Sequence, residues 1–161
     1  MRLSKRRRAW LLAIIVLSLS FAVDTASTLA AGPDVRSGDL NPLVRTLSNE
    51  AYVGWSLARL AIGAALLSLF WPKRLVLEEG VRHGWLAIVI PFLYREAATY
   101  WVAFAVMVIG PLKTVSSVSN LWVLHNSQPV PAGVTVVLGL ILGVLVSNTI
   151  LFSQSEPASD Q

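Results

Sequence analysis

The sequence contains no cysteine among its 161 residues. Disulfide bonds, catalytic thiolates and metal sites that need sulfur ligands are therefore excluded. Charged residues are scarce as well, at 14%, where soluble domains carry about 25%. The two histidines, His83 and His125, are far apart in the sequence and away from the ionisable residues of the apolar blocks. Because a catalytic triad or a histidine metal site needs such groups close together, we expect no enzyme, metal or cofactor.

Hydrophobic residues make up 55% of the chain, and the mean hydropathy is +0.64. They form four long blocks, at residues 10–31, 51–71, 84–110 and 133–152. Each block reaches the roughly 20 residues that a helix needs to cross a bilayer. The sequence therefore predicts an all-α, multi-pass membrane protein with one four-helix domain over residues 1–152 and a polar tail at 153–161.

The basic residues predict how the helices are oriented. Of the thirteen Lys and Arg residues, five precede the first block and three flank the loop between the second and third blocks. The other two loops hold only Arg36, Arg45 and Lys113. By the positive-inside rule, both termini are expected on the cytoplasmic side of the cell membrane. This placement also explains the pI of about 10.0, so we expect the bilayer as partner and no nucleic acid.

The first block also resembles a secretory signal, with a basic start and small residues at Ser20 and Ala22. Its apolar run is longer than the roughly 7 to 15 residues of a signal's apolar region. We therefore expect a retained helix, with a cleaved signal as the alternative.

Four ionisable side chains lie inside the apolar blocks. They are Asp24, Arg59, Arg95 and Glu96. Two acids and two bases form a neutral group if the helices bring them together, which is how charge is tolerated in hydrocarbon. We expect Asp24 to pair with Arg59, and Arg95 and Glu96 to join from the third helix. Neighbouring residues differ by about 100° around a helix, so the sequence leaves open whether both of these face inward.

Polar neighbours extend this predicted cluster. Thr28 shares a face with Asp24, and Thr99 and Tyr100 share one with Glu96. Two interpretations remain open: a salt-bridged core that fixes helix register, or a working site for an ion, a proton or an anionic ligand. Pro91, just before the Arg95–Glu96 pair, predicts a weakened helical turn there.

Small residues recur at helical spacing in two blocks. One set is Ala58, Ala61, Ala65 and Ser68, and the other is Gly139, Gly143 and Ser147. Such residues let helix backbones approach closely, although they are also simply common in membrane helices. Residues 112–131 are expected as an outer loop whose Leu121–Leu124 segment forms an apolar patch, exposed for a partner or folded back onto the bundle.

The segment after the first block predicts a short helix at the outer interface. Asn41 is a suitable N-cap and Pro42 a suitable first residue. Together with Asp24, Thr28 and Asp39, these residues resemble the pattern of an uncharacterised family of small bacterial and archaeal membrane proteins, which has an Asp-x-x-Ser/Thr-Thr motif in the first helix followed by an acidic-x-Asn-Pro motif. The resemblance covers about residues 10–71 and implies no activity.

Two functions remain from these observations. We expect a non-enzymatic accessory or assembly subunit, which packs against a membrane protein partner or a second copy of itself. The alternative is a minimal oligomeric transporter or channel, in which Asp24 and Glu96 bind a cation or carry a proton.

Overall fold

The computed structural model describes residues 4–32, 42–72, 97–126 and 130–153. The helices in these ranges are α1 (Lys5–Ala31), α3 (Pro42–Arg45), α4 (Asn49–Phe70), α6 (Ala97–Asn126) and α7 (Ala132–Phe152). Four of them, α1, α4, α6 and α7, are long and apolar enough to cross a membrane. The predicted all-α, multi-pass architecture is confirmed.

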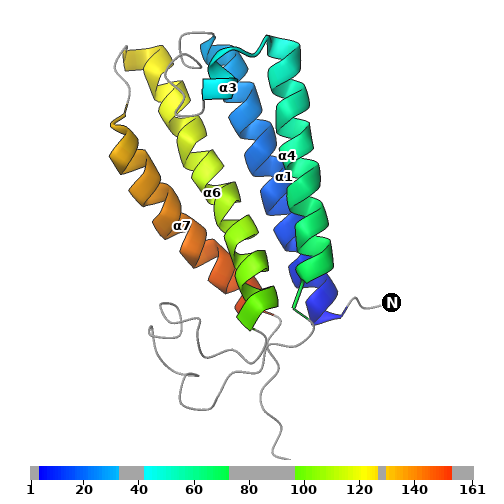
Figure 1. Ribbon diagram of the computed structural model, residues 1–161. Helices are drawn as coiled ribbons and strands as arrows, with labels where there is room; N and C mark the ends of the chain where they lie inside the picture. The colour runs from blue at the N-terminus through cyan, green and yellow to red at the C-terminus, as the bar shows by residue number, and fades with distance from the viewer. Residues whose placement is uncertain (1–3, 33–41, 73–96, 127–129, 154–161) are drawn as a thin grey trace, which may run out of the picture.

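The four long helices form a bundle with α1 and α6 at its centre (Figure 1). These two run in the same direction, while α4 lies beside α1 and α7 beside α6, both in the opposite direction. The described chain therefore begins and ends at the same end of the bundle, which we call the Ser4 end. The opposite end, where α1 finishes, is called the Gly32 end.

Local sequence signals fix where α1 and α4 begin and end. The Ser4 hydroxyl accepts a hydrogen bond from the Arg7 amide at 3.4 Å, and the Ser48 hydroxyl accepts one from the Ala51 amide at 3.2 Å. Both serines thus satisfy amides that the first turn leaves without helical partners. At the other end of α1, Gly32 has a φ of +82°, and its amide donates to the Leu29 carbonyl at 3.3 Å. That φ suits glycine because it has no Cβ.

The predicted short helix after α1 is confirmed as the single turn α3. It begins at Pro42, as expected, and ends at Arg45. Val44 anchors it with 1% of its surface exposed, whereas Leu43 is 63% exposed. The predicted cap, Asn41, lies outside the described residues.

The third span differs from its predicted bounds of 84–110. The helix α6 continues through Gly110 and Pro111 to Asn126, and the part that could cross a membrane is Trp101–Val123. Proline removes one helical hydrogen bond, and neighbouring helices in a membrane can compensate for that loss. The segment expected as an outer loop is therefore helical as far as Asn126. Residues 84–96, including Pro91, lie outside the described residues.

The core changes character along the bundle. Towards the Ser4 end, the buried residues of α1 are Ala9, Ala13 and Leu17. They belong to an apolar cluster that also contains Ala103, Val106 and Met107 of α6. Towards the Gly32 end, the buried residues of α1 are mainly polar. One half of the α1–α6 contact is thus held by apolar packing, and the other half depends on polar interactions.

The helix α7 packs against α6 through its small residues. A Cβ added to Gly139 would lie 3.0 Å from the Cα of Leu112, and one added to Gly143 would lie 3.1 Å from the Cα of Val108. Ser147, one turn further, has no exposed surface. The contact is with backbone atoms, so a larger residue at either glycine requires α7 to move away from α6.

We predict that Gly143→Ala lowers the free energy of unfolding in detergent by about 1 to 3 kcal/mol, because its methyl group forces the two backbones apart. Gly133→Ala is the matched control, since a Cβ there meets nothing within 4 Å. It should be neutral or slightly stabilising because alanine favours the helix. Equal stability of the two variants in thermal unfolding would contradict this packing.

Candidate functional site

The centre of the candidate site is an ion pair between Asp24 of α1 and Lys113 of α6. The Lys113 Nζ lies 3.0 Å from the Asp24 Oδ2. The Asp24 side chain is only 3% exposed and that of Lys113 is 22% exposed. The contact has the distance of an ion pair but not the alignment of a hydrogen bond, since Oδ2 has no hydrogen-bond partner in the described chain. Each charge thus balances the other inside the bundle.

Hydrogen bonds continue along the α1–α6 contact, from residues on both sides of Asp24 in α1. The Thr114 hydroxyl donates to the Ser20 hydroxyl at 3.0 Å. The Asn120 amide donates to the Thr28 hydroxyl at 3.0 Å and to that of Ser27 at 3.4 Å. We call this set the polar seam. Its members are Ser20, Asp24, Ser27 and Thr28 of α1, and Lys113, Thr114 and Asn120 of α6.

The polar seam fixes the register of α1 and α6. Its contacts involve Ser20, Asp24 and Thr28 along α1, and Lys113, its neighbour Thr114 and, two turns later, Asn120 along α6. Sliding one helix along the other would break all of them together. Buried hydrogen bonds between membrane helices are worth about 0.6 kcal/mol each on average. A buried charge left without its partner costs about 3 to 5 kcal/mol. The ion pair is therefore the strongest constraint on the register.

The helix α4 joins the polar seam through one side chain. Tyr52 is 2% exposed, and its hydroxyl donates to the Thr28 hydroxyl at 3.3 Å. Thr28 therefore accepts hydrogen bonds from both α4 and α6. This residue connects three helices near the Gly32 end.

Arg59 of α4 lies in a separate setting, between aromatic rings of α1 and α4. The carbon of its guanidinium group is 5.7 Å from the centre of the Phe21 ring and 5.5 Å from that of Trp55. One Nη donates to the Ser56 hydroxyl at 3.4 Å. The Nε is enclosed and has no hydrogen-bond partner in the described chain. We call Arg59, Phe21, Trp55 and Ser56 the Arg59 cage.

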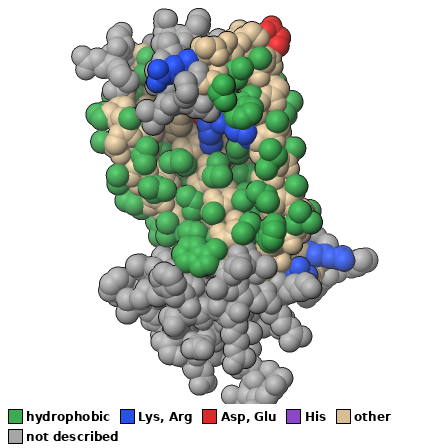
Figure 2. All heavy atoms as spheres, viewed as in Figure 1, with side chains coloured by type: hydrophobic (Ala, Val, Ile, Leu, Met, Phe, Trp, Pro, Cys, Tyr) green, Lys and Arg blue, Asp and Glu red, His purple; other side chains and the backbone are tan. Residues whose placement is uncertain are grey.

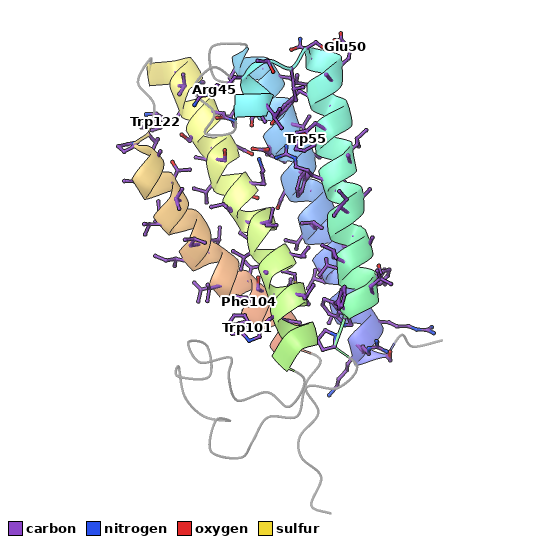
Figure 3. The ribbon with its side chains drawn as sticks, in the orientation of Figure 1. Arg45, Glu50, Trp55, Trp101, Phe104 and Trp122 are labelled. Atoms are coloured by element: carbon purple, nitrogen blue, oxygen red, sulfur yellow. The ribbon has the colours of Figure 1, made fainter. Side chains whose placement is uncertain are left out.

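In Figure 3, the labelled Trp55 side chain of the Arg59 cage projects from α4 on the side of α1. Figure 2 shows that hydrophobic side chains cover most of this face of the described bundle, with a few basic side chains among them. Rings on both sides stabilise a cation by about 0.5 to 2 kcal/mol each, but they do not neutralise it.

The predicted pairing of Asp24 with Arg59 is wrong. The partner of Asp24 is Lys113, and within the described residues no acidic side chain forms an ion pair with Arg59. The reason is the extra length of α6, which brings Lys113 into the membrane beside α1. A sequence signal was present, because Lys113, Ser117 and Asn120 recur at helical spacing and give this stretch one polar face.

Of the other predicted site residues, some lie within the described ranges and some lie outside them. Thr28 lies in the polar seam, and Pro42 begins α3. Thr99 and Tyr100 belong to the first turn of α6, and their side chains are outside the description. Arg95, Glu96, Asp39 and Asn41 lie outside the described residues.

A groove of about 280 Å³ lies between α1 and α4. It is lined mainly by apolar side chains, with hydroxyl groups from Ser18, Thr25 and Ser56. Within the described part of the chain, no group of three or more acidic or histidine side chains is placed to hold a metal ion. His125 is exposed in the last turn of α6.

The sequence matches no model of a known protein family, no curated protein and no solved structure. The resemblance to small bacterial and archaeal membrane proteins therefore stays a prediction. Function has to be inferred from the charges and faces of the chain itself.

The charges that lie well inside the described spans do not cancel. Apart from residues at the helix ends, they are Asp24, Arg59 and Lys113, so two cations face one anion and the net charge is +1. Asp24 is held by Lys113, and this leaves Arg59 as the cation without an anionic partner among the described residues.

We predict strong coupling between Asp24 and Lys113. Lys113→Gln should lower the free energy of unfolding by about 3 to 5 kcal/mol, because it leaves a buried carboxylate without its cationic partner. Asp24→Asn should cost less, since the partly exposed ammonium can shift towards water. The double variant should cost less than the sum of the two.

The matched control for this cycle combines Asp24→Asn with Arg59→Gln, and its effects should be nearly additive. Unfolding of the purified protein in detergent measures all the variants. Additive losses for Asp24 and Lys113 would show that their charges do not stabilise each other.

Proposed function

We propose that the protein is a non-enzymatic subunit of a membrane assembly, and that α4 docks against a transmembrane helix of a partner protein. The observation that carries this proposal is a line of small residues along α4, all of which are exposed. They are Ala51, Gly54, Ala58, Ala61, Ala65 and Ser68. We call this line the α4 face.

The spacing of the α4 face suits contact with another helix. Its members alternate at intervals of three and four residues, which keeps them on one side of the helix over its whole length. Small side chains there allow a second backbone to approach closely. Gly139 and Gly143 illustrate the same principle within this chain, because α6 covers them. The α4 face has no such cover from the described helices.

The burial of the four spans supports the same conclusion. In α4, 11% of the span is buried within the chain, whereas the figure is 33% for each of α1, α6 and α7. Lipid favours no particular side-chain size, but dispersion and packing between helices do favour small residues. We therefore assign the α4 face to a partner helix in preference to lipid alone.

The alternative, a minimal transporter or channel using Asp24 and Glu96, is less well supported. Asp24 is almost fully buried and already paired with Lys113. Binding a cation or a proton there would break that pair and leave the Lys113 charge without its partner. Glu96 lies outside the described residues. The pair acts, in our proposal, as the fixed core of a scaffold.

For the location, we propose the cell membrane with both termini in the cytoplasm. The basic residues Lys5, Arg6, Arg7 and Arg8 are exposed at the Ser4 end, and basic residues concentrate on the cytoplasmic side of membrane proteins. Since α7 runs back towards the same end (Figure 1), the C-terminal side of the bundle shares that location.

The absence of cysteine allows a direct test of this topology. Single cysteines at exposed Thr46, near the Gly32 end, and at exposed Ser153, at the Ser4 end, can be labelled without background. In intact cells, a membrane-impermeant maleimide should label Thr46→Cys and leave Ser153→Cys unlabelled until the cells are opened. The reverse pattern would invert the proposed orientation.

Partner binding is tested on the α4 face. We predict that Ala61→Leu leaves the bundle folded, because the added side chain points away from it, but removes a stoichiometric partner from the protein purified in mild detergent. Ile62→Phe is the matched control, since Ile62 is 60% exposed beside the α4 face. Mass spectrometry of the co-purified proteins gives the result.

Two results would count against the proposal. Co-purification that survives Ala61→Leu would remove the α4 face as the docking surface. A clean homo-oligomer of the original chain, with no second protein, would replace the partner helix by another copy and revive the transporter alternative.

A further inference from the structure

We propose that Arg59 anchors a binding site for a phosphate group, at the junction of α1 and α4. This inference is separate from the docking of α4, because the small residues of the α4 face point away from the bundle and Arg59 is packed against Phe21 within it. It rests on the unmet donors of Arg59, on the balance of charges and on access to the site.

The first argument is the hydrogen-bonding capacity of Arg59. A guanidinium group has five N–H donors in a planar fork. The described structure satisfies one of its nitrogens, through Ser56, and leaves the enclosed Nε without a partner. An unmet donor is unfavourable, and more so when it is charged. Because Nε is enclosed, a ligand would bind through the Nη donors, which in the described chain have only the bond to Ser56.

The aromatic rings of the Arg59 cage do not satisfy these N–H donors. A ring stabilises a cation through its π face and accepts poorly from N–H groups in the guanidinium plane. Phe21 and Trp55 therefore hold the group in place, and apart from the bond to Ser56 its Nη donors have no hydrogen-bond partner in the described chain. The two Nη atoms together match two oxygens of a phosphate group.

The second argument is charge. Arginine keeps its proton in proteins, so Arg59 cannot become neutral, as a buried lysine can. The described charges well inside the spans sum to +1, and since Asp24 balances Lys113, the excess charge is that of Arg59. A phosphodiester has a charge of −1, and so does dihydrogen phosphate. Binding it would make the intramembrane group neutral, which the surrounding hydrocarbon favours.

The third argument is access. Trp55 is 37% exposed and Arg59 is partly exposed, so the Arg59 cage reaches the surface of the described chain. Ser56 accepts from Arg59, which leaves its own hydroxyl proton free to donate to a ligand oxygen. The site thus offers two kinds of donor to one anion.

The phosphate group has two possible sources. Arg59 is the eleventh of the 22 residues of α4, about 15 Å from the helix end. A phospholipid whose headgroup sinks between the helices from the Gly32 end could supply a phosphodiester. A soluble phosphate that enters from the same end would make the same contacts. The chemistry at Arg59 is shared, and the experiment separates the two sources.

The experiment measures binding of two probes to the full-length protein. Inorganic phosphate is titrated in detergent at constant ionic strength, with thermal stability as the readout, because a ligand of the folded state raises the unfolding temperature. Phosphatidylglycerol is added to the same protein, and native mass spectrometry counts the bound lipids. We expect one of the two probes to bind saturably, and the probe that binds identifies the source of the phosphate group.

Variants then assign the binding to Arg59. Arg59→Gln should weaken it about tenfold or more, because it removes a charged, two-point hydrogen bond. Arg59→Lys should fall in between, since it keeps the charge and loses the fork. Arg8→Gln is the matched control, because it removes one exposed positive charge at the Ser4 end and should bind like the original protein.

The proposal is overturned if neither probe binds saturably, or if folded Arg59→Gln, checked by circular dichroism, binds as tightly as the Arg8→Gln control. Ala61→Leu should lose the co-purified partner and still bind phosphate like the original protein. Failure of the docking proposal and failure of this one are therefore distinguishable.

Discussion

The buried ion pair between Asp24 and Lys113 is the constraint on which the rest of the bundle depends. A carboxylate that is 3% exposed among apolar helices needs a cation beside it. Only a continuous α6 can bring Lys113 to that position, so the helix has to pass through Pro111 without ending. Once the pair is formed, the hydrogen bonds of Ser20 and Thr28 to α6 fall into register. The parallel α1–α6 contact is thus specified by charge and hydrogen bonding as well as by packing.

Around this central contact the two outer helices are used differently. The glycines of α7 already take part in packing within the chain, because backbone atoms of α6 lie close against them. The helix α4 is attached more lightly, through Tyr52 and apolar contacts on its inner side, and its small residues remain outside. The same residue type therefore has two roles in one bundle. This asymmetry makes α7 part of the core, and it is the physical basis of our proposal that α4 is the side that meets a partner.

Arg59 adds a second asymmetry, this time of charge. Its two aromatic neighbours stabilise the guanidinium group but supply no negative charge. Because Asp24 is committed to Lys113, the membrane interior of the described chain holds one positive charge more than it balances. The docking that we propose for α4 and the anion binding that we propose at Arg59 concern different sides of one helix, so the two proposals do not compete for the same surface.

The sequence by itself determined the number of spans, the approximate positions of the first, second and fourth, and the presence of charge inside them, because hydrophobic length and intramembrane charge are local properties of the chain. It also located the start of α3 from Pro42. It did not determine the partner of Asp24, because Gly110, Pro111 and Lys113 together resemble a loop when read locally. Nor could it distinguish the small residues of α7 from those of α4. Both questions depend on which helix faces which, and only the tertiary structure decided that, through contacts between residues far apart in the chain.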